Sequence, residues 1–369
     1  MSEDNPYMVC VCHDLSNLHT GTRSDGEGPY KRAKPEGRRA GERAAVVSTV
    51  DVKGLGSPTG LFVLADGTIL ACAGHCIRTF KLGRHSQAQV LAGFDQGNGF
   101  RDGPGDEARF GDLQGITVDP DGYVMVLDSG NKAVRLVSMD GQVRTLVGGL
   151  QSSARFGKLN DLVMTPEGHY VMTDFSNHTV WVFMYGGAVR KLAGNGSPGF
   201  VDGSGLAAQF DGPSGLALDR DGSILVADWG NNAIRRVAMD GTVSTVAGNG
   251  KEGCADGAGR EARFRGPCAV VVDMEGTIVV ADSGNNRLRR ITGRHVTTMA
   301  GGSAAGAETG TADGNGQDAR FDRPYRLALD ERGRLLVAEV AGVDKLRVVD
   351  ASLAPPAWMG PIKTADRRT

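Results

Sequence analysis

The 369-residue sequence predicts an all-β fold, a six-bladed β-propeller whose blades are four-stranded antiparallel sheets. Two recurring phrases and a glycine content of 55 residues lead to this prediction. The phrase VADWGNNAIRRV at 226–237 returns as VADSGNNRLRRI at 280–291, and looser copies begin at Val126 and Met172. Glycine reaches about twice its usual share of ~7%, which indicates many tight turns between short apolar runs.

The second phrase, Ala-Arg-Phe and its variants, precedes the first at a constant distance. From its phenylalanine to the acid of the first phrase there are 18 positions in every copy: Phe110 to Asp128, Phe156 to Asp174, Phe210 to Asp228, Phe264 to Asp282 and Phe321 to Glu339. A degenerate copy comes first, with Leu55 and Ala73 in these two positions. Six units spaced by about 50 residues indicate a repeat architecture.

Each unit is interpreted as four strands. In the fourth unit the runs GLALD, SILVAD, AIRRVAMD and TVSTVAG are separated by RDG, WGNN and DG. Short runs rich in β-branched residues between Asp-Gly and Gly-Asn turns are typical of strands in hairpins. Four strands in a unit of about 50 residues, repeated six times, predict a propeller.

The pattern F-x-x-P-x-G-L-A-x-D-x-D-G-x-I-x-V-A-D-x-x-N-x-x-I-R-R resembles the NHL repeat, and the resemblance covers about residues 46–350. The match is specific in the fourth and fifth units and fainter in the first, third and sixth. Residues 1–45 are polar and rich in Gly and Arg, so a disordered tail is expected there. A second tail is expected at 351–369.

The last unit lacks a good fourth strand. After three strands it continues into ASLAPPAWMGP, whereas VVSTVDV at 46–52 has the form of the missing strand. We expect this N-terminal strand to pair into the last blade and close the ring. Closure leaves only short, protected sheet edges.

The recurring Asp-x-x-Asn after the second strand is predicted to be structural. Short polar side chains there bond nearby backbone amides and hold a turn. An arginine recurs in the third strand and could pair with the acid of its unit; these arginines are Arg135, Arg235, Arg289 and Arg347. The alternative is a ring of carboxylates around a cation. Hydrogen bonds within the turn explain the pattern without a ligand, so the repeated phrase is interpreted as structural rather than functional.

Residues that depart from the repeat are the candidates for binding. In an up-and-down blade, the loops after the second strand share one face with the connections between blades, and binding residues tend to lie on such loops. On this face we predict that Phe175, Trp229, Tyr325 and Arg326 contact a partner. The alternatives are packing under a neighbouring loop for the first two and a solvated rim charge for Arg326.

The mouth of the central channel is expected just before each innermost strand. The polar residues predicted to line it are Gln114, Asn160, Asp161 and Ser214. Six-bladed propellers that resemble gluconolactonases hold a divalent metal there through Glu, Asn and Asp, but this mouth offers no Glu. NHL-type lyases use a histidine cluster on zinc, whereas the seven histidines here share no repeat position. No catalytic residue, metal or cofactor is therefore predicted, and a gluconolactonase-like hydrolase is kept as an alternative.

Charge and composition restrict the partners. The net charge is −2, and acids and bases are interleaved within each repeat, so RNA binding is a less favoured alternative. No apolar run approaches the ~18 residues of a membrane helix, and no basic region precedes the first apolar patch. The six cysteines form no paired framework. We expect a cytoplasmic monomer, a non-catalytic scaffold for a protein or peptide ligand.

Overall fold

The computed structural model describes residues 44–149, 155–184, 186, 188–302, 309–340, 342–351 and 353–356. Contacts between residues divide the chain into Met1–Ala40 and Gly41–Thr369, and everything below concerns the second unit. The predicted N-terminal tail lies outside the described residues except for Ala44 and Ala45. Most of the predicted C-terminal tail also lies outside them.

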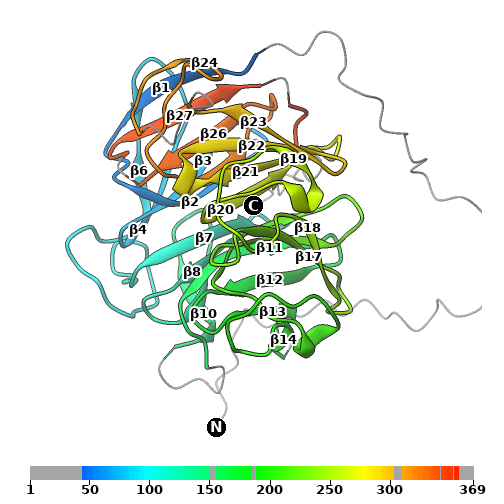
Figure 1. Cartoon of the computed structure of the whole chain (residues 1–369). Helices are drawn as coiled ribbons and strands as arrows, with labels where there is room; N and C mark the ends of the chain where they lie inside the picture. Colours follow the sequence, from blue (N-terminus) through cyan, green and yellow to red (C-terminus); the bar gives the residue numbers. More distant parts are fainter. Residues whose placement is uncertain are drawn as a thin grey trace, which may run out of the picture. The chain divides into compact units, whose positions relative to one another are not determined.

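Six antiparallel sheets form the blades of a propeller, which confirms the predicted fold class (Figure 1). Blade 1 contains β2 (Pro58–Val63), β3 (Ile69–Ala73), β4 (Cys76–Phe80) and β6 (Gln89–Gly93). Blade 2 contains β7 (Leu113–Val118), β8 (Val124–Asp128), β9 (Ala133–Val137) and β10 (Val143–Gly148). Blade 3 contains β11 (Leu159–Met164), β12 (His169–Asp174), β13 (Thr179–Met184) and β14 (Arg190–Ala193).

The other three blades repeat this order. Blade 4 contains β15 (Pro213–Leu218), β16 (Ile224–Asp228), β17 (Ala233–Val237) and β18 (Val243–Ala247). Blade 5 contains β20 (Pro267–Val272), β21 (Ile278–Asp282), β22 (Arg287–Thr292) and β23 (His295–Ala300). Blade 6 contains β25 (Pro324–Leu329), β26 (Leu335–Glu339), β27 (Lys345–Asp350) and β1 (Val46–Lys53). The short elements are β5 (Ser86–Gln87), β19 (Gly257–Ala258), β24 (Gly314–Asn315), η1 (Gly205–Ala207), η2 (Gly259–Glu261) and η3 (Ser283–Asn285).

Blade 6 combines the two ends of the propeller. Strand β1 pairs antiparallel with β27, in a register that runs from Val46 opposite Asp350 to Asp51 opposite Lys345. Val47 and Val52 of β1 are buried on opposite faces of the strand, and each belongs to a different hydrophobic cluster. The N-terminal strand therefore has the place of the fourth strand that the last unit lacks.

The innermost strands surround the channel. In cyclic order β2, β7, β11, β15, β20 and β25 each contact the next, and β25 contacts β2. Figure 1 shows β2, β7, β11 and β20 near the centre of the ring. Glycine permits this close approach: a Cβ on Gly115 would lie 2.7 Å from the Cα of Asp161 on the next blade. The repeat thus favours glycine at this position for a packing reason.

The repeated arginine and acid form a buried ion pair, as predicted. In blade 4, Nη1 of Arg235 donates to Oδ2 of Asp228 over 2.7 Å, and both side chains are fully buried. Nη2 donates to Asp202 of the preceding connection over 2.7 Å, and the guanidinium lies 5.1 Å from the centroid of Phe210. Asn231 donates to the same Asp228 carboxylate. Equivalent pairs join Arg135 to Asp128, Arg289 to Asp282 and Arg347 to Glu339.

Among the described residues, no helix is long and apolar enough to span a membrane.

Candidate functional site on the loop-bearing face

The loop-bearing face is the side of the propeller that carries the loops after β3, β8, β12, β16, β21 and β26 together with the connections between blades. Three features meet there: a polar cluster in the mouth of the channel, a pair of aromatic side chains, and a pocket. Each is built from positions at which the blades differ from one another.

The channel cluster is centred on Arg326 of β25. Its Nη2 donates to Oδ1 of Asn160 over 2.6 Å, to the backbone carbonyl of Asn160 over 2.9 Å and to Oε1 of Gln114 over 3.3 Å. Its Nε donates to the backbone carbonyl of Thr59, and the guanidinium stacks 4.4 Å from the ring centroid of Tyr325. Arg326 is only 3% exposed. Arg326 is therefore not a solvated rim charge, and its contact with a partner stays a prediction.

The other predicted mouth residues belong to the same cluster. The hydroxyl of Ser214 lies 3.3 Å from Oδ1 of Asn160 and donates to the backbone carbonyl of Cys268 over 2.9 Å. The hydroxyl of Tyr325 donates to Oε1 of Gln114 over 3.1 Å. Gln114, Asn160 and Ser214 are buried, whereas Tyr325 is half-buried. The structure thus brings the predicted mouth residues together around one guanidinium.

Asp161 places a carboxylate beside this guanidinium. Its two oxygens accept backbone hydrogen bonds from Leu162 over 3.0 Å and Leu216 over 2.9 Å. Burial raises the pKa of Asp161 above its ordinary value, against the opposing charge of Arg326. Burial lowers the pKa of Arg326, but the acidic groups around it, Tyr325 and Asp161 foremost with Cys268 and Cys72, together raise it above its ordinary value. Arg326 therefore stays charged inside the channel.

The two aromatic residues of the prediction, Phe175 and Trp229, contact each other. Their ring centroids lie 5.7 Å apart with an interplanar angle of 55°. Each ring covers a glycine of the next blade: an added Cβ would lie 2.8 Å from Phe175 at Gly212 and 2.9 Å from Trp229 at Gly266. Trp229 nevertheless remains 45% exposed. Packing against the neighbouring blade and exposure to solvent therefore both apply to this pair.

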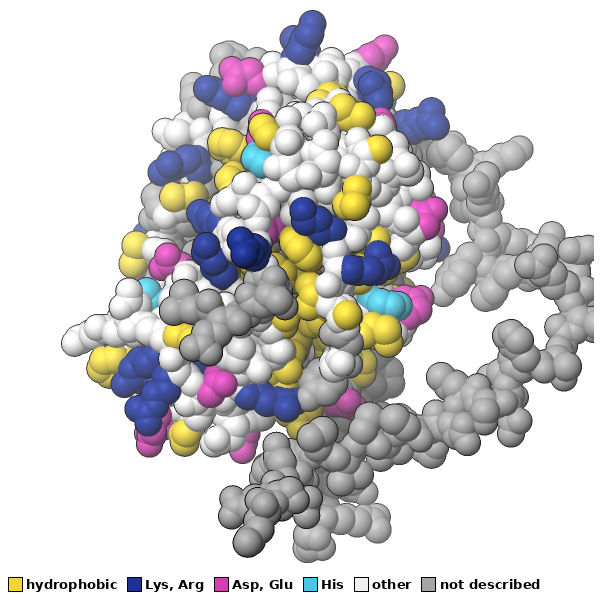
Figure 2. Space-filling model, turned by 90° about the horizontal axis from the view of Figure 1, so that it is seen from below, with side chains coloured by type: hydrophobic (Ala, Val, Ile, Leu, Met, Phe, Trp, Pro, Cys, Tyr) yellow, Lys and Arg dark blue, Asp and Glu magenta, His cyan; other side chains and the backbone are white. Residues whose placement is uncertain are grey.

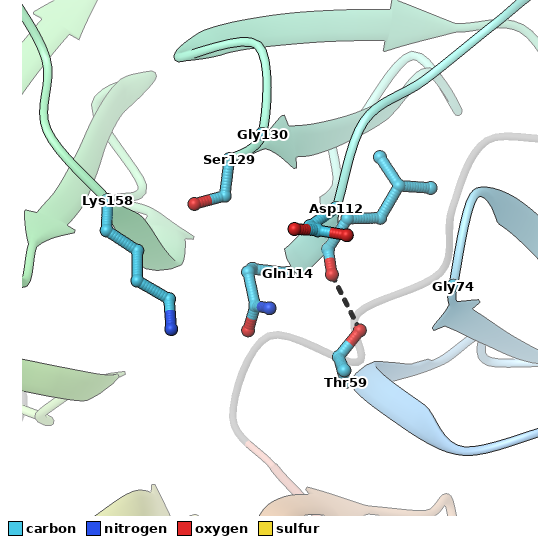
Figure 3. A pocket seen from close by; sticks show the side chains of 8 residues that line it. Thr59, Gly74, Asp112, Gln114, Ser129, Gly130 and Lys158 are labelled. Carbon is cyan, nitrogen blue, oxygen red and sulfur yellow. Dashed lines mark hydrogen bonds between the residues drawn. The ribbon is translucent and has the colours of Figure 1, made fainter. Parts of the chain in front are cut away.

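A pocket of about 370 Å³ opens over blades 1 and 2 (Figure 3). Its polar lining comes from Thr59, Asp112, Gln114, Ser129 and Lys158. Figure 3 shows the Asp112 carboxylate and the Lys158 ammonium on different walls, with the Gln114 side chain between them. The hydroxyl of Thr59 donates to the backbone carbonyl of Leu113 over 2.7 Å. The pocket therefore offers one negative charge, one positive charge and several uncharged polar groups.

The pocket exists because two side chains are small. In blades 3 and 4 the residue after the repeated acid is Phe175 or Trp229, and each ring covers the next blade. The same position holds Gly74 in blade 1 and Ser129 in blade 2, and both line the pocket. The repeat thus leaves this part of the face uncovered.

Two observations bear on metal and nucleic-acid chemistry. Within the described ranges, no group of three or more His, Cys, Asp or Glu side chains is placed to hold a metal ion. Figure 2 shows Lys and Arg in separate groups, with Asp, Glu and hydrophobic side chains between them, on the face that it displays. In the view of Figure 2 the basic side chains do not form one continuous stripe of the kind that tracks a phosphate backbone.

A family model described as the NHL repeat matches residues 210–236, which run from Phe210 into β17 of blade 4. This chain contains an NHL repeat within a six-bladed β-propeller. Among curated relatives, NHL repeat-containing protein 2 of Bos taurus is 30% identical over 157 residues, 39% of this chain and 21% of the relative. Protein SUPPRESSOR OF QUENCHING 1, chloroplastic, of Arabidopsis thaliana is 30% identical over 159 residues, 40% of this chain and 15% of the relative. The matched segment thus spans about a fifth or less of the length of each of these relatives.

Solved structures resemble the NHL propeller in fold. A gluconolactonase from Xanthomonas campestris has a TM-score of 0.55 and 15% identity, and the match covers 88% of this chain and 100% of that one. A streptogramin B lyase has a TM-score of 0.54 and 12% identity, over 84% of this chain and 98% of that one. At such low identity the likeness shows the fold alone.

Two members of the site were missed from the sequence. Asp112 and Lys158 stand two positions after the repeat phenylalanine, where the later blades hold Gly212, Gly266 and Arg323. A comparison of this position across the NHL repeats would have marked both as departures. Their joint exposure depends on the small residues Gly74 and Ser129, and it becomes visible when adjacent blades are packed together.

Proposed function

We propose that this propeller is a non-catalytic binding scaffold that presents its loop-bearing face to a protein or peptide partner. The observation that carries the proposal is the contact between Phe175 and Trp229 over 5.7 Å, with Trp229 45% exposed. A tryptophan that is held in place by a second ring and still reaches solvent can enter a partner with little further loss of side-chain freedom. Tryptophan is among the residues that most often dominate interfaces.

The charge next to this pair supports recognition of a polar chain. The Lys158 ammonium lies 5.9 Å from the ring centroid of Phe175, so a positive charge borders the aromatic surface. Protein interfaces commonly combine a central aromatic contact with a polar rim. The Phe175 and Trp229 rings with Lys158 offer this combination on one side of the channel.

The chemistry of the channel favours a scaffold over a metal-dependent hydrolase. A divalent ion would need the oxygens of Asn160, Gln114 and Asp161, but the first two accept hydrogen bonds from Arg326. The fixed positive charge of this guanidinium repels a second cation at the same place. The Arg326 guanidinium therefore takes the place that a metal cation would have in the channel.

The proposal is tested by exchanging one exposed aromatic residue on each face. Proteins recovered by cross-linking to the full chain are identified, and their affinities are measured with wild type, Trp229→Ala and Tyr123→Ala. Tyr123 is 43% exposed at the β7–β8 hairpin, on the opposite face, so its loss is a matched control. Trp229→Ala should weaken binding about 30-fold or more, the effect of a hot spot of ~2 kcal/mol.

Melting temperatures establish that each variant remains folded. Equal affinity of wild type and Trp229→Ala, or loss of binding with Tyr123→Ala alone, would place the partner elsewhere. Recovery of RNA that is released at moderate salt would support the nucleic-acid alternative instead.

A further inference from the structure

The pocket over blades 1 and 2 combines opposite charges that no other described residue neutralises. No ion pair joins the Asp112 carboxylate or the Lys158 ammonium to another described side chain, and both residues are exposed. By contrast, the repeat acids and arginines elsewhere in the blades are paired in the core. Two unpaired opposite charges on the walls of one cavity are suited to a ligand that carries both an anionic group and a hydrogen-bond donor.

The groups between these charges have defined hydrogen-bonding roles. Oε1 of Gln114 accepts from Tyr325 and Arg326, which orients the amide so that its Nε2 is left as a donor. The Thr59 hydroxyl gives its proton to the carbonyl of Leu113, so its oxygen is left as an acceptor. The pocket therefore has donors at Lys158 and Gln114 and acceptors at Asp112 and Thr59.

Charge selects among anions for this pocket. A doubly charged phosphate would meet the Asp112 carboxylate within the same cavity, and like charges at such short range repel. A carboxylate carries a single charge and can receive the charge-assisted bonds of Lys158 and the Gln114 amide. A nitrogen donor on the carbon atom next to this carboxylate would then form a hydrogen bond to the Asp112 carboxylate.

We propose that this pocket binds an α-carboxylate together with the nitrogen on its α-carbon. Its volume of about 370 Å³ falls at the lower end of ligand pockets and suits a single amino-acid residue. The same unit occurs in the C-terminal residue of a peptide and in a free amino acid. Continuity with Phe175 through Lys158 favours the peptide, an assignment that rests on the proposed scaffold function.

The probes are N-acetyl amino acids, each as free acid and as carboxamide, together with the corresponding free amino acids. Binding to the full chain is followed by NMR of backbone amides at probe concentrations up to about 10 mM, where even weak single-residue ligands register. The acids should bind about tenfold or more tightly than their carboxamides, because only the acids accept a charge-assisted bond from Lys158. The shifts should centre on residues 112–114 and 129–130.

Variants separate the two walls of the pocket. Lys158→Met should weaken the acids about tenfold, whereas Lys81→Met, which removes an exposed lysine on the opposite face, should leave them unchanged. Asp112→Asn should weaken a free amino acid more than its N-acetyl form, because the ammonium has the stronger bond to lose. Ser129→Phe should block the pocket in the way that Phe175 covers Gly212, and Ser283→Phe in blade 5 is its matched control.

The comparison of the probes also shows whether the natural ligand is a peptide C-terminus or a free amino acid. Tighter binding of N-acetyl forms supports a peptide C-terminus, and tighter binding of free amino acids supports a small zwitterion; either result supports the shared chemistry. Equal affinity of acids and carboxamides, absence of shifts, or wild-type affinity in Lys158→Met would overturn the proposal. Because these probes do not reach Trp229, Trp229→Ala should bind them normally, so the pocket and the scaffold function can fail separately.

Discussion

Thr49 and Asp313 are 264 positions apart, yet the Thr49 hydroxyl donates to Oδ1 of Asp313 over 2.7 Å. The Thr49 backbone amide donates to Oδ2 over 2.9 Å, and Nη2 of Arg347 donates to Oδ1 over 3.0 Å. The same arrangement occurs within blade 4, where Thr245 and Arg235 donate to Asp202. An acid of the connecting segment thus fastens the outer strand of each of these blades, and in blade 6 that strand comes from the opposite end of the propeller sequence.

The N-terminal strand should close the ring. Removal of residues 1–40 should leave the melting temperature nearly unchanged, because β1 remains. Removal of residues 1–53 deletes the partner of β27 and exposes the surface that Val47 and Val52 cover. The loss of two buried valines and a strand ladder should lower the melting temperature by about 10 °C or more. Equal melting temperatures of the two truncated chains would contradict closure by β1.

The Asp313 contact should depend on pH. Burial tends to raise the pKa of Asp313, but the bonds from Thr49 and the charge of Arg347 outweigh it and lower the pKa below its ordinary value. A lowered pKa stabilises the fold above the unfolded-state pKa of about 3.9, and this contribution is lost as the pH falls through the folded-state pKa. Asp313→Asn should therefore be less stable than wild type at pH 7 by about 1 kcal/mol, a modest effect because the group is half-exposed.

Urea unfolding of both proteins from neutral to strongly acidic pH measures this difference. The two curves should converge in acid. A gap that is the same at every pH would show that the Asp313 charge is not responsible.

The fold was predictable because each blade solves the same packing problem with the same residues. The constant spacing of phenylalanine and acid, the Asp-Gly hairpins and the arginine of the third strand are all local, and the structure joins them within one blade. The position of each strand within the repeat likewise predicted that the last unit lacks its fourth strand. None of these inferences needed the position of one blade relative to the next.

Removal of the repeated arginine in one blade should destabilise the protein strongly. Arg235→Met leaves the fully buried Asp228 without its cation, which typically costs about 3–5 kcal/mol. Lys81→Met is the control, because Lys81 and Asp66 form an exposed pair and such pairs contribute at most about 1 kcal/mol. Midpoints of urea unfolding, at unchanged slope, report both effects.

The Arg235→Met variant should also have a characteristic pH dependence. Burial raises the pKa of Asp228 to about 6 even against the charge of Arg235. Without the arginine it should rise further, so the native variant binds a proton that its unfolded state does not hold at mildly acidic pH. Its stability should therefore increase as the pH falls from 8 to 5, and a deficit independent of pH would point to lost packing instead.

The channel should not respond to divalent metals. Calcium or zinc should leave the melting temperature of wild type unchanged and produce no lactonase activity, because Arg326 already bonds the oxygens of Asn160 and Gln114. Asn160→Ala with Asp161→Ala should have the same stability with and without calcium. A metal-induced rise in the wild-type melting temperature that this double variant abolishes would favour the hydrolase alternative.

The site was less predictable than the fold because it depends on neighbouring blades. The departure of Arg326 from the repeat was visible in the sequence, but its burial follows from the approach of Thr59 and Asn160 on other blades. Asp112 and Lys158 are likewise exposed because Gly74 and Ser129 are too small to cover the neighbouring blade. A repeat identifies which residues differ, whereas packing between repeats decides which of them reach solvent.

The pairing of β1 with β27 also means that β1 is synthesised long before its partner strand. Ser48 contacts Val348, 300 positions later. At about 5–20 residues per second on the ribosome, β1 waits on the order of 15–60 s for its partner. During that interval it is an unpaired strand edge, the kind of surface on which other chains can add. Asp51 and Lys53 place exposed charges along this strand, and such charges oppose that association until the last blade is complete.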